Sequence, residues 1–382
     1  MSAALEFSAN EELRAELREW LAENPPPAID VVATREDADT LRAWQRTLQA
    51  GRWVGIHWPS EYGGRGASVT QVAIYNEELA RAGSPALLGR AGITLVGPTL
   101  VAHGTDEQRT RWMPRILAGD DIWCQLFSEP GAGSDLAALS TRAVLRNGVY
   151  RVTGQKVWSS YATFANIGIA LVRTDPDAPR HRGISMLAMP MDADGVDVRP
   201  LRQMTGDSEF NEVFLDDVAV PVDHLIGTEN DGWRVANTTL ANERGASFIW
   251  KEQVLHEAAI DRLWKTCSGA GLLDNPLVRQ RLARSWMDVE IFRLHNRRTL
   301  ARLARGDAIG SESSLVKLFW ANTSQRLYET ACDVLGPEAL LEQSDWGRGL
   351  LSTRANSIMG GTSEIQRTII GERLLGLPRE PR

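Results

Sequence analysis

The sequence contains few cysteines for a chain of 382 residues. Its three cysteines, Cys124, Cys267 and Cys332, lie far apart, and none has the spacing of a metal site. A disulfide framework and a cysteine-based metal centre are therefore excluded as interpretations. We expect reduced thiols, a cytoplasmic protein and no bound metal.

Long apolar runs and strongly basic stretches are also absent. No segment is long and apolar enough to span a bilayer, and the first residues lack the basic and apolar regions of a secretory signal. The formal net charge is −7, and acidic and basic residues are interspersed, so no basic face for nucleic acid is visible. We therefore expect no membrane insertion, no secretion and no nucleic-acid partner.

The N-terminal part, residues 1–120, has the pattern of a helical domain. Ser8–Glu11 has the form of a capping box and precedes leucines at every fourth position, which predicts a helix that begins at Ser8. Ser68–Gln71 and Thr105–Gln108 predict two further helices by the same capping pattern. Apolar residues at helical spacing predict another helix across residues 41–48.

From about Asp121 the period of the apolar residues changes from that of a helix to that of a strand. Short alternating runs separated by turn residues predict strands over 149–153, 167–173, 184–190, 196–198 and 213–221. The pair Asn147-Gly148 predicts a hairpin turn ahead of the first of these runs. A series of short strands indicates a small β-barrel or sandwich, which we assign to residues 121–226.

Helical periodicity returns in residues 227–382. The expected helices, over 233–266, 275–305, 311–335 and 363–375, are long enough to form a four-helix bundle. The predicted fold class is therefore α+β, with an all-α N-terminal domain, a central small β-barrel or sandwich, and a C-terminal four-helix bundle.

Two segments of the predicted barrel carry the features of a cofactor site. Residues 123–135 end in a turn that contains Gly131 and Gly133, where backbone N–H groups can approach an anion. Residues 154–160 place Trp158 and two hydroxyls at the end of a strand. A flavin needs this combination, although a plain β-turn and a core tryptophan are the structural alternatives.

A dinucleotide-binding fold is excluded by context. The Rossmann fingerprint needs a third glycine and then a helix whose N-terminus faces the pyrophosphate. Here Gly133 is followed by a strand, an Asn-Gly hairpin and a second strand. Gly131 and Gly133 therefore belong to a β-structure.

The order of the predicted domains and four motifs resembles the acyl-CoA dehydrogenase family over nearly the whole chain. The motifs are Ser128–Asp135, Gly154–Trp158, Phe214–Pro221 and Gly361–Arg367. The resemblance implies an enzyme that binds FAD between barrel and bundle and dehydrogenates an acyl-CoA to the trans-2-enoyl-CoA. It also implies an electron-transfer flavoprotein as electron acceptor and a tetrameric assembly.

In that family a glutamate removes the proton next to the thioester carbonyl. This base must lie within hydrogen-bond reach of the proton, and burial beside an apolar acyl chain raises the pKa of a carboxyl toward neutrality. Most members carry the glutamate immediately before the Gly-Thr of the C-terminal motif, where this chain has Gly360. A minority carry it on the first long bundle helix before an arginine, which matches Glu243 and Arg244. Glu243 is therefore the candidate base, and a solvated helix glutamate is the alternative.

The resemblance also implies further site residues. Residues that match flavin-contacting positions of the family are Gln125, Ser128, Gly133, Ser134, Trp158, Ser160, Thr362 and Glu364. Among these, Trp158 matches the indole that packs on the ring and Ser160 the hydroxyl near the flavin N5. Arg244, Gly360 and Gly361 match positions beside the thioester or the acyl group. Glycine at two of these positions favours a branched, cyclic or otherwise bulky acyl group.

The chain departs from the family in two elements that reach a neighbouring subunit's FAD in many homotetramers. An Arg-x-x-Phe-Gly element is absent from Lys265–Pro276, and a Gly-Gly-x-Gly turn is replaced at Leu335–Ala339. Both losses suggest a partner subunit that is related but different, as in some bacterial acyl-CoA dehydrogenases of sterol breakdown. Both a homotetramer and a heterotetramer remain open.

Three other functions remain open on the same scaffold. An acyl-CoA oxidase or a flavin monooxygenase would return electrons to molecular oxygen, and nothing in the sequence separates these from a dehydrogenase. A non-catalytic subunit of a heteromer would have no need of a base, so Glu243 argues against that alternative.

Overall fold

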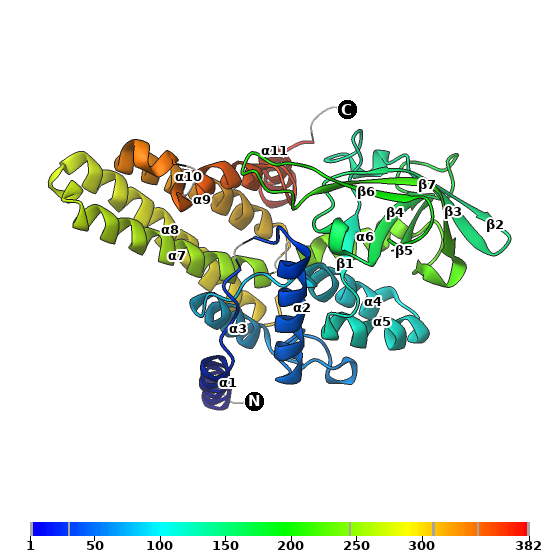
Figure 1. Ribbon diagram of the computed structural model, residues 1–382, viewed down its shortest axis with the longest axis horizontal. Coiled ribbons are helices and arrows are strands. Elements are labelled where there is room, and N and C mark those ends of the chain that lie inside the picture. The colour runs from blue at the N-terminus through cyan, green and yellow to red at the C-terminus, as the bar shows by residue number, and fades with distance from the viewer. Residues whose placement is uncertain (1–2, 30, 244–245, 308–309, 342–343, 380–382) are drawn as a thin grey trace. The chain divides into compact units, whose positions relative to one another are not determined.

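The computed structural model describes residues 3–29, 31–243, 246–307, 310–341 and 344–379, with the backbone alone at 3–8, 243 and 246–249 (Figure 1). The chain divides into two compact units. We name Met1–Glu19, Ser68–Ala82 and Arg244–Arg382 the bundle unit, and Trp20–Ala67 and Gly83–Glu243 the sheet unit.

The sheet unit contains one eight-stranded sheet. Its strands are β1 (Trp123–Leu126), β2 (Arg142–Arg146), β3 (Val149–Lys156), β4 (Ile167–Arg173), β5 (Ile184–Pro190), β6 (Val196–Pro200), β7 (Asn211–Pro221) and β8 (Leu225–Ile226). The strand order is β6-β7-β3-β2-β4-β5-β8, and β1 pairs in parallel with β4. The middle part of the chain is therefore a β-structure, as the period of its apolar residues predicts (Figure 1).

The expected hairpin joins β2 to β3. Asn147 and Gly148 both have positive φ, at 52° and 77°, which is the backbone of the tight turn that Asn-Gly favours. The strands pair in antiparallel register from Arg142 opposite Thr153 to Arg146 opposite Val149. Side chains of β3 that point inward, including Tyr150 and Val152, join the apolar core of this sheet.

In the sequence of the sheet unit, helices precede the first strand and follow the last one. They are α2 (Arg35–Ala50), α4 (Gly97–His103), α5 (Asp106–Ala118) and α6 (Gly232–Glu243), with a π-helical turn at Gly92–Val96. A capping box at Thr105 and Gln108 opens α5, as expected from the sequence. Helix α6 packs against α4, β5 and the π-helical turn, so it belongs to this unit.

The bundle unit contains α1 (Ala3–Glu23) up to Glu19, α3 (Val69–Arg81), α7 (Ala246–Gly269), α8 (Pro276–Leu303), α9 (Glu312–Leu335), α10 (Asp345–Ser352) and α11 (Ser363–Ile369), which continues as a π-helical turn to Leu374. Helices α7, α8 and α9 pack on one another around a shared apolar core. Helix α3 packs on α7 and α8, although it lies early in the sequence.

One expected helix boundary is wrong. The first helix begins at Ala3 rather than Ser8, because good helix formers precede Ser8 and extend the helix past its capping pattern. The stretch expected as one helix over 233–266 is helical up to Glu243 in α6 and from Ala246 in α7. Residues 244–245 lie outside the described part of the chain.

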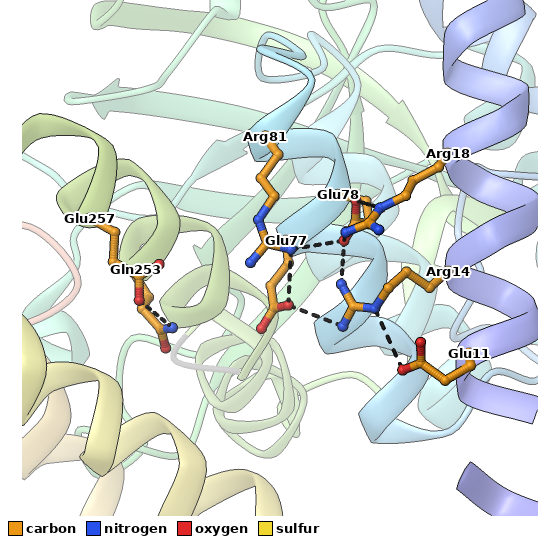
Figure 2. A network of polar contacts seen from close by, with 8 residues as sticks. All are labelled: Glu11, Arg14, Arg18, Glu77, Glu78, Arg81, Gln253 and Glu257. Atoms are coloured by element: carbon orange, nitrogen blue, oxygen red, sulfur yellow. Dashed lines mark hydrogen bonds and ion pairs between the residues drawn. The ribbon is translucent and has the colours of Figure 1, made fainter. Parts of the chain in front are cut away.

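A buried carboxylate joins α1 to α3 within the bundle unit. Glu78 is 4% exposed and accepts hydrogen bonds from Arg18 Nε at 2.6 Å and Arg81 Nη1 at 2.8 Å, and a further one from Arg14 (Figure 2). Burial alone would raise the pKa of Glu78, but the hydrogen bonds and charges of Arg18 and Arg14 outweigh it and lower the pKa. Glu78 is therefore ionised, and the network holds the two helices together.

Candidate active site

A buried ion pair joins the two segments that the sequence marks as a cofactor site. Lys156, at the end of β3, is fully buried, and its Nζ lies 2.9 Å from Oε1 of Glu129. The same ammonium donates to the carbonyl oxygens of Phe127 at 3.2 Å and Leu171 at 2.7 Å. In addition, the Val157 N–H donates to the Ser128 carbonyl at 2.9 Å. The end of β1 and the end of β3 are thus held side by side.

The charges of this pair depend on each other. Burial would raise the pKa of Glu129, but the Lys156 charge and hydrogen bonds from Lys156, Thr141 and Ser140 lower it to about 2. Burial lowers the pKa of Lys156 to about 8, and Glu129 opposes that fall. Glu129 is ionised near neutral pH, and Lys156 compensates its charge in the interior.

The turn that follows Glu129 leaves room for a ligand. The N–H and carbonyl of Glu129 each bond to Ala132 at 3.0 Å, which closes a tight turn. At Gly131 and Gly133, no other atom lies within 4 Å of the place that a Cβ atom would take. Gly133 and Ser134 are exposed. The backbone is therefore accessible to a bulky anionic group such as a pyrophosphate.

The segment after Lys156 presents a tryptophan to solvent. Trp158 is 60% exposed and touches Phe210 edge-on, with the ring centroids 5.9 Å apart. Trp158 and Tyr161 have positive φ, at 61° and 56°, which costs a residue with a side chain about 1–2 kcal/mol. Such backbone strain is concentrated at functional sites.

Asn211 holds this strained segment in place. Its backbone N–H and carbonyl exchange hydrogen bonds of 3.1 Å with Ser159, and its Nδ2 donates to the Ser159 carbonyl at 2.9 Å. The Ser159 hydroxyl oxygen is buried and has no hydrogen-bond partner among the residues that the structure describes. Together with the exposed indole and the open glycine turn, this orphaned hydroxyl fits the polar edge and flat face of a flavin.

Six of the predicted flavin residues belong to the sheet unit, and they are Gln125, Ser128, Gly133, Ser134, Trp158 and Ser160. Gln125 lies on β1 opposite Ile169 of β4 and is partly exposed. The ion pair and the Val157 bond bring Ser128 close to Trp158, and Ser160 follows two residues later.

Helix α6 carries the candidate base at its last residue, Glu243. A buried hydrogen bond of 2.9 Å joins the hydroxyls of Thr99 on α4 and Thr239 on α6. Thr239 precedes Glu243 by four residues, which is one helical turn. The side chain of Glu243 and all of Arg244 lie outside the described part of the structure.

The remaining predicted residues, Gly360, Gly361, Thr362 and Glu364, belong to the bundle unit. Gly360 and Gly361 have φ values of 63° and 94°. The Thr362 hydroxyl caps α11 by accepting from the Ile365 N–H at 3.2 Å, and the Glu364 side chain is 79% exposed beside Arg367.

Two residues fix the backbone of Gly360 and Gly361, the glycine pair, and neither was predicted from the sequence. Gln366 is fully buried, and its Nε2 donates to the carbonyls of Gly360 and Gly361, each at 3.1 Å. Lys317 on α9 donates to the Gly361 carbonyl at 2.7 Å. Gln366 lies inside a recognised motif, whereas no sequence signal marks Lys317 as a buried lysine.

Lys156 was missed as well, although a signal was present. It is in phase with the inward-facing Tyr150 and Val152 on the same strand, so alternation predicts a buried lysine that needs an anionic partner. Glu129 lies in the other marked segment and is that partner.

The sheet, the helices and this site define a flavin-dependent oxidoreductase. Three family models match the chain, namely acyl-CoA dehydrogenase N-terminal domain over residues 8–120, middle domain over 124–218 and C-terminal domain over 230–375. The chain belongs to the acyl-CoA dehydrogenase family. It is therefore an oxidoreductase with FAD as cofactor, as the sequence motifs predicted.

Several similar proteins cover nearly the whole chain. Acyl-CoA dehydrogenase IpdE1 of Mycobacterium tuberculosis is 40% identical, over 97% of this chain and 98% of its own. Acyl-CoA dehydrogenase FadE26 of the same organism is 36% identical over the same share of this chain. A structure of the ChsE4-ChsE5 complex from M. tuberculosis has a TM-score of 0.84 at 34% identity, covering 97% of this chain and 98% of its own. The Tcur3481-Tcur3483 steroid ACAD has a TM-score of 0.87 at 30% identity and covers 98% of each chain.

Among the residues that the structure describes, no helix has the length and apolar character needed to cross a bilayer. Within the same part of the chain, no group of three or more His, Cys, Asp or Glu side chains is arranged to hold a metal ion.

Proposed function

We propose that this protein dehydrogenates an acyl-CoA thioester between the α and β carbons, and that its acyl group is cyclic or otherwise bulky. The observation that carries the proposal is the backbone at Gly360 and Gly361. Both residues have positive φ and carbonyls held by Gln366, so the segment favours glycine where most of the family carries its base. In the proposal, the absence of a side chain at Gly360 leaves space beside the α-carbon of the substrate, whereas Gln366 Nε2 lies 2.7 Å from the place that a Cβ atom would take at Gly361.

Glu243 takes the role of the base in this proposal. It is the last residue of α6, and the next residue is an arginine, as in family members that carry the base on this helix. Its carboxylate would accept the α-proton, and burial beside the acyl chain would raise its pKa to suit that work. When bound, FAD supplies the acceptor for the hydride from the β-carbon.

The residues of the sheet unit bind and orient in this scheme. Trp158 offers an aromatic face to the ring, Ser160 a hydroxyl to its N5 edge, and the turn at Gly131 and Gly133 accessible N–H groups to the pyrophosphate. In the proposal, Gln125, Ser128, Ser134, Thr362 and Glu364 are further residues that contact the cofactor.

A steroid-derived acyl group is the substrate class that we favour. One structural relative is described as a steroid ACAD, and the glycine pair gives a physical reason for accepting a fused ring system. An electron-transfer flavoprotein is the proposed acceptor of the electrons, from the family resemblance.

We further propose that the active assembly is a heterotetramer with a related subunit. Two solved relatives are named as pairs of different proteins, and this chain lacks both sequence elements that commonly reach a neighbour's FAD. Full and equivalent FAD occupancy after expression of this chain alone would contradict this assembly and favour a homotetramer.

The compartment that we propose is the cytoplasm. All three cysteines are free, and Cys124 and Cys267 are buried. Burial raises the pKa of the Cys124 thiol to about 12, which keeps it unreactive.

Substitution of Glu243 by glutamine tests the reaction. We expect the variant to retain FAD but to lose most of its turnover with the acyl-CoA that bleaches the wild-type flavin. Unchanged turnover would remove Glu243 as the base. Rapid oxygen consumption by the reduced wild-type protein would indicate an oxidase or a monooxygenase instead.

A further inference from the structure

A second cavity, of about 440 Å³, lies within the bundle unit, and no residue of the proposed active site lines it. Figure 2 shows Gln253 and Glu257 of α7 on one side of it and Glu77 and Arg81 of α3 on the other. Its volume suits a small organic molecule. Six charged residues line the cavity, and they are Arg14, Arg81, Arg293, Arg297, Glu77 and Glu257.

A buried indole also lines this cavity. Trp250 is 2% exposed, and its Nε1 has no hydrogen-bond partner among the residues that the structure describes. Buried polar groups are almost always hydrogen-bonded, because an unpaired one costs free energy. A ligand in the cavity that carries an acceptor oxygen would satisfy this N–H.

The arginines of the cavity have hydrogen-bond donors to spare. Arg297 is exposed and forms no ion pair with any carboxylate in the described part of the chain. Arg293 lies one helical turn earlier on α8 and donates from Nε at 3.0 Å to Glu290 of the same helix. Arg81 donates from Nη1 to Glu78 at 2.8 Å. Each guanidinium has five N–H donors, so these bonds leave several for a ligand.

The positive charge of the region is small, although arginines outnumber glutamates on the wall itself. Behind the wall, Glu78, Glu290 and the exposed Glu11 offset part of the arginine charge, and Arg18 adds to it. Directed bonds from guanidinium N–H groups, rather than a large net charge, would therefore hold a ligand. This balance favours a ligand with one oxyanion group over a polyphosphate.

The two glutamates of the wall constrain the rest of the ligand. Glu257 accepts a hydrogen bond from Gln253 Nε2 at 3.0 Å, and Glu77 accepts one from Arg14 Nη2 at 3.4 Å. A carboxylate has about four lone-pair positions, so both side chains can accept further hydrogens. An apolar body would take water away from these carboxylates without replacing it, whereas hydroxyl groups would donate to them.

We propose that this cavity binds a small hydroxylated organic anion, either a sugar phosphate or a sugar acid, with Arg297 holding its oxyanion group. A guanidinium binds phosphate and carboxylate alike through two parallel N–H bonds, so the two kinds of ligand share this chemistry. Hydroxyl groups of the body donate to Glu77 and Glu257, and the buried Trp250 N–H donates to a ligand oxygen. The inference does not depend on the proposed reaction, because none of these residues takes part in it.

Isothermal titration calorimetry of the purified holoprotein tests the site. Glucose-6-phosphate and gluconate are the anionic probes, glucose is the probe without charge, and inorganic phosphate is the probe without a hydroxylated body. We expect saturable binding of at least one of the two organic anions, with glucose and inorganic phosphate each at least about tenfold weaker. The tighter of the two anions identifies whether the oxyanion is a phosphate or a carboxylate.

Three variants locate the bound anion. Arg297→Met should weaken its binding at least about tenfold, and it should fold because Arg297 is exposed. Arg298→Met is the matched control on the same helix, since Arg298 bonds to Glu312 at 3.2 Å and does not line the cavity. This control should keep the wild-type affinity. Trp250→Phe keeps an aromatic ring without the N–H, and it should weaken binding about fivefold.

Several results would overturn the inference. Heat without saturation for both organic anions, or glucose bound as tightly as either, would show that the cavity is not an anion site. Inorganic phosphate bound as tightly as glucose-6-phosphate would remove the hydroxylated body from the proposal. Equal losses in Arg297→Met and Arg298→Met, or an unchanged affinity in Trp250→Phe, would place the anion elsewhere. Turnover with acyl-CoA tests Glu243 separately, so failure here leaves the proposed reaction standing.

Discussion

Replacement of Lys156 by methionine should both destabilise the sheet unit and weaken FAD binding. The ammonium of Lys156 is fully buried and has three acceptors, which are Glu129 and the carbonyls of Phe127 and Leu171. Methionine has a similar length but no charge and no donor. The variant therefore leaves a buried carboxylate without its counter-charge.

The structure sets the size of the effect in two ways. Breaking a buried ion pair by removing one partner costs about 3–5 kcal/mol. The pKa of Glu129, about 2 against an ordinary value of 4.5, corresponds to about 3 kcal/mol of interaction in favour of the charged form. Both values come close to half the stability of a typical domain.

Chemical unfolding at pH 7, followed by tryptophan fluorescence, measures the loss of stability. The titration of apoprotein with FAD measures the affinity. Arg151→Met is the matched control, because Arg151 lies on the same strand and its partner Asp217 is exposed. A Lys156 variant that is as stable as this control, with unchanged FAD affinity, would show that the ion pair does not join the two segments of the site.

The other predictions concern the bundle unit, the base and its helix. Glu78→Gln should lower the free energy of unfolding by about 3 kcal/mol at pH 7, and the more exposed Glu77→Gln by less. Because the folded state lowers the pKa of Glu78, the stabilisation by its carboxylate is complete above about pH 4.5 and is lost as the pH falls further. The free energies of unfolding of the wild-type protein and of Glu78→Gln should therefore converge in acid. Gly360→Glu should strain the backbone by about 1–2 kcal/mol and reduce kcat/KM more for bulky than for linear acyl-CoAs, and equal losses would contradict the proposed pocket. Thr239→Val should cost about 1–2 kcal/mol and reduce kcat through a misplaced α6, while Thr239→Ser keeps the hydroxyl and should restore both.

Turn and helix-cap motifs were predicted well from the sequence, because their structures depend on interactions between residues that are close in sequence. The hairpin at Asn147 and Gly148 formed because both residues tolerate positive φ at low cost. The capping boxes at Ser68 and Thr105 formed because each side chain bonds to the backbone three residues later. The same pattern at Ser8 did not mark a boundary, since the preceding residues also favour a helix.

Residues that stabilise the site through distant contacts were harder to predict. Lys317 contacts the Gly361 carbonyl across 44 positions of sequence, and the Glu209 carbonyl accepts a hydrogen bond from the Tyr161 N–H, which lies far from it in sequence. Neither has a spacing that marks its partner. Lys156 was predictable in principle, because its strand phase points inward and a buried lysine needs an anion.

Three of the segments that contain predicted site residues share an arrangement, in which the segment is held by polar side chains outside the expected set. Lys156 and Glu129 hold the glycine turn, Asn211 and Glu209 hold the strained segment after Trp158, and Gln366 and Lys317 hold the glycine pair. A buried polar side chain that bonds to the backbone of such a segment favours one conformation of it. A conservative change in one of these supporting residues should therefore alter FAD affinity without removing a residue that faces the ligand.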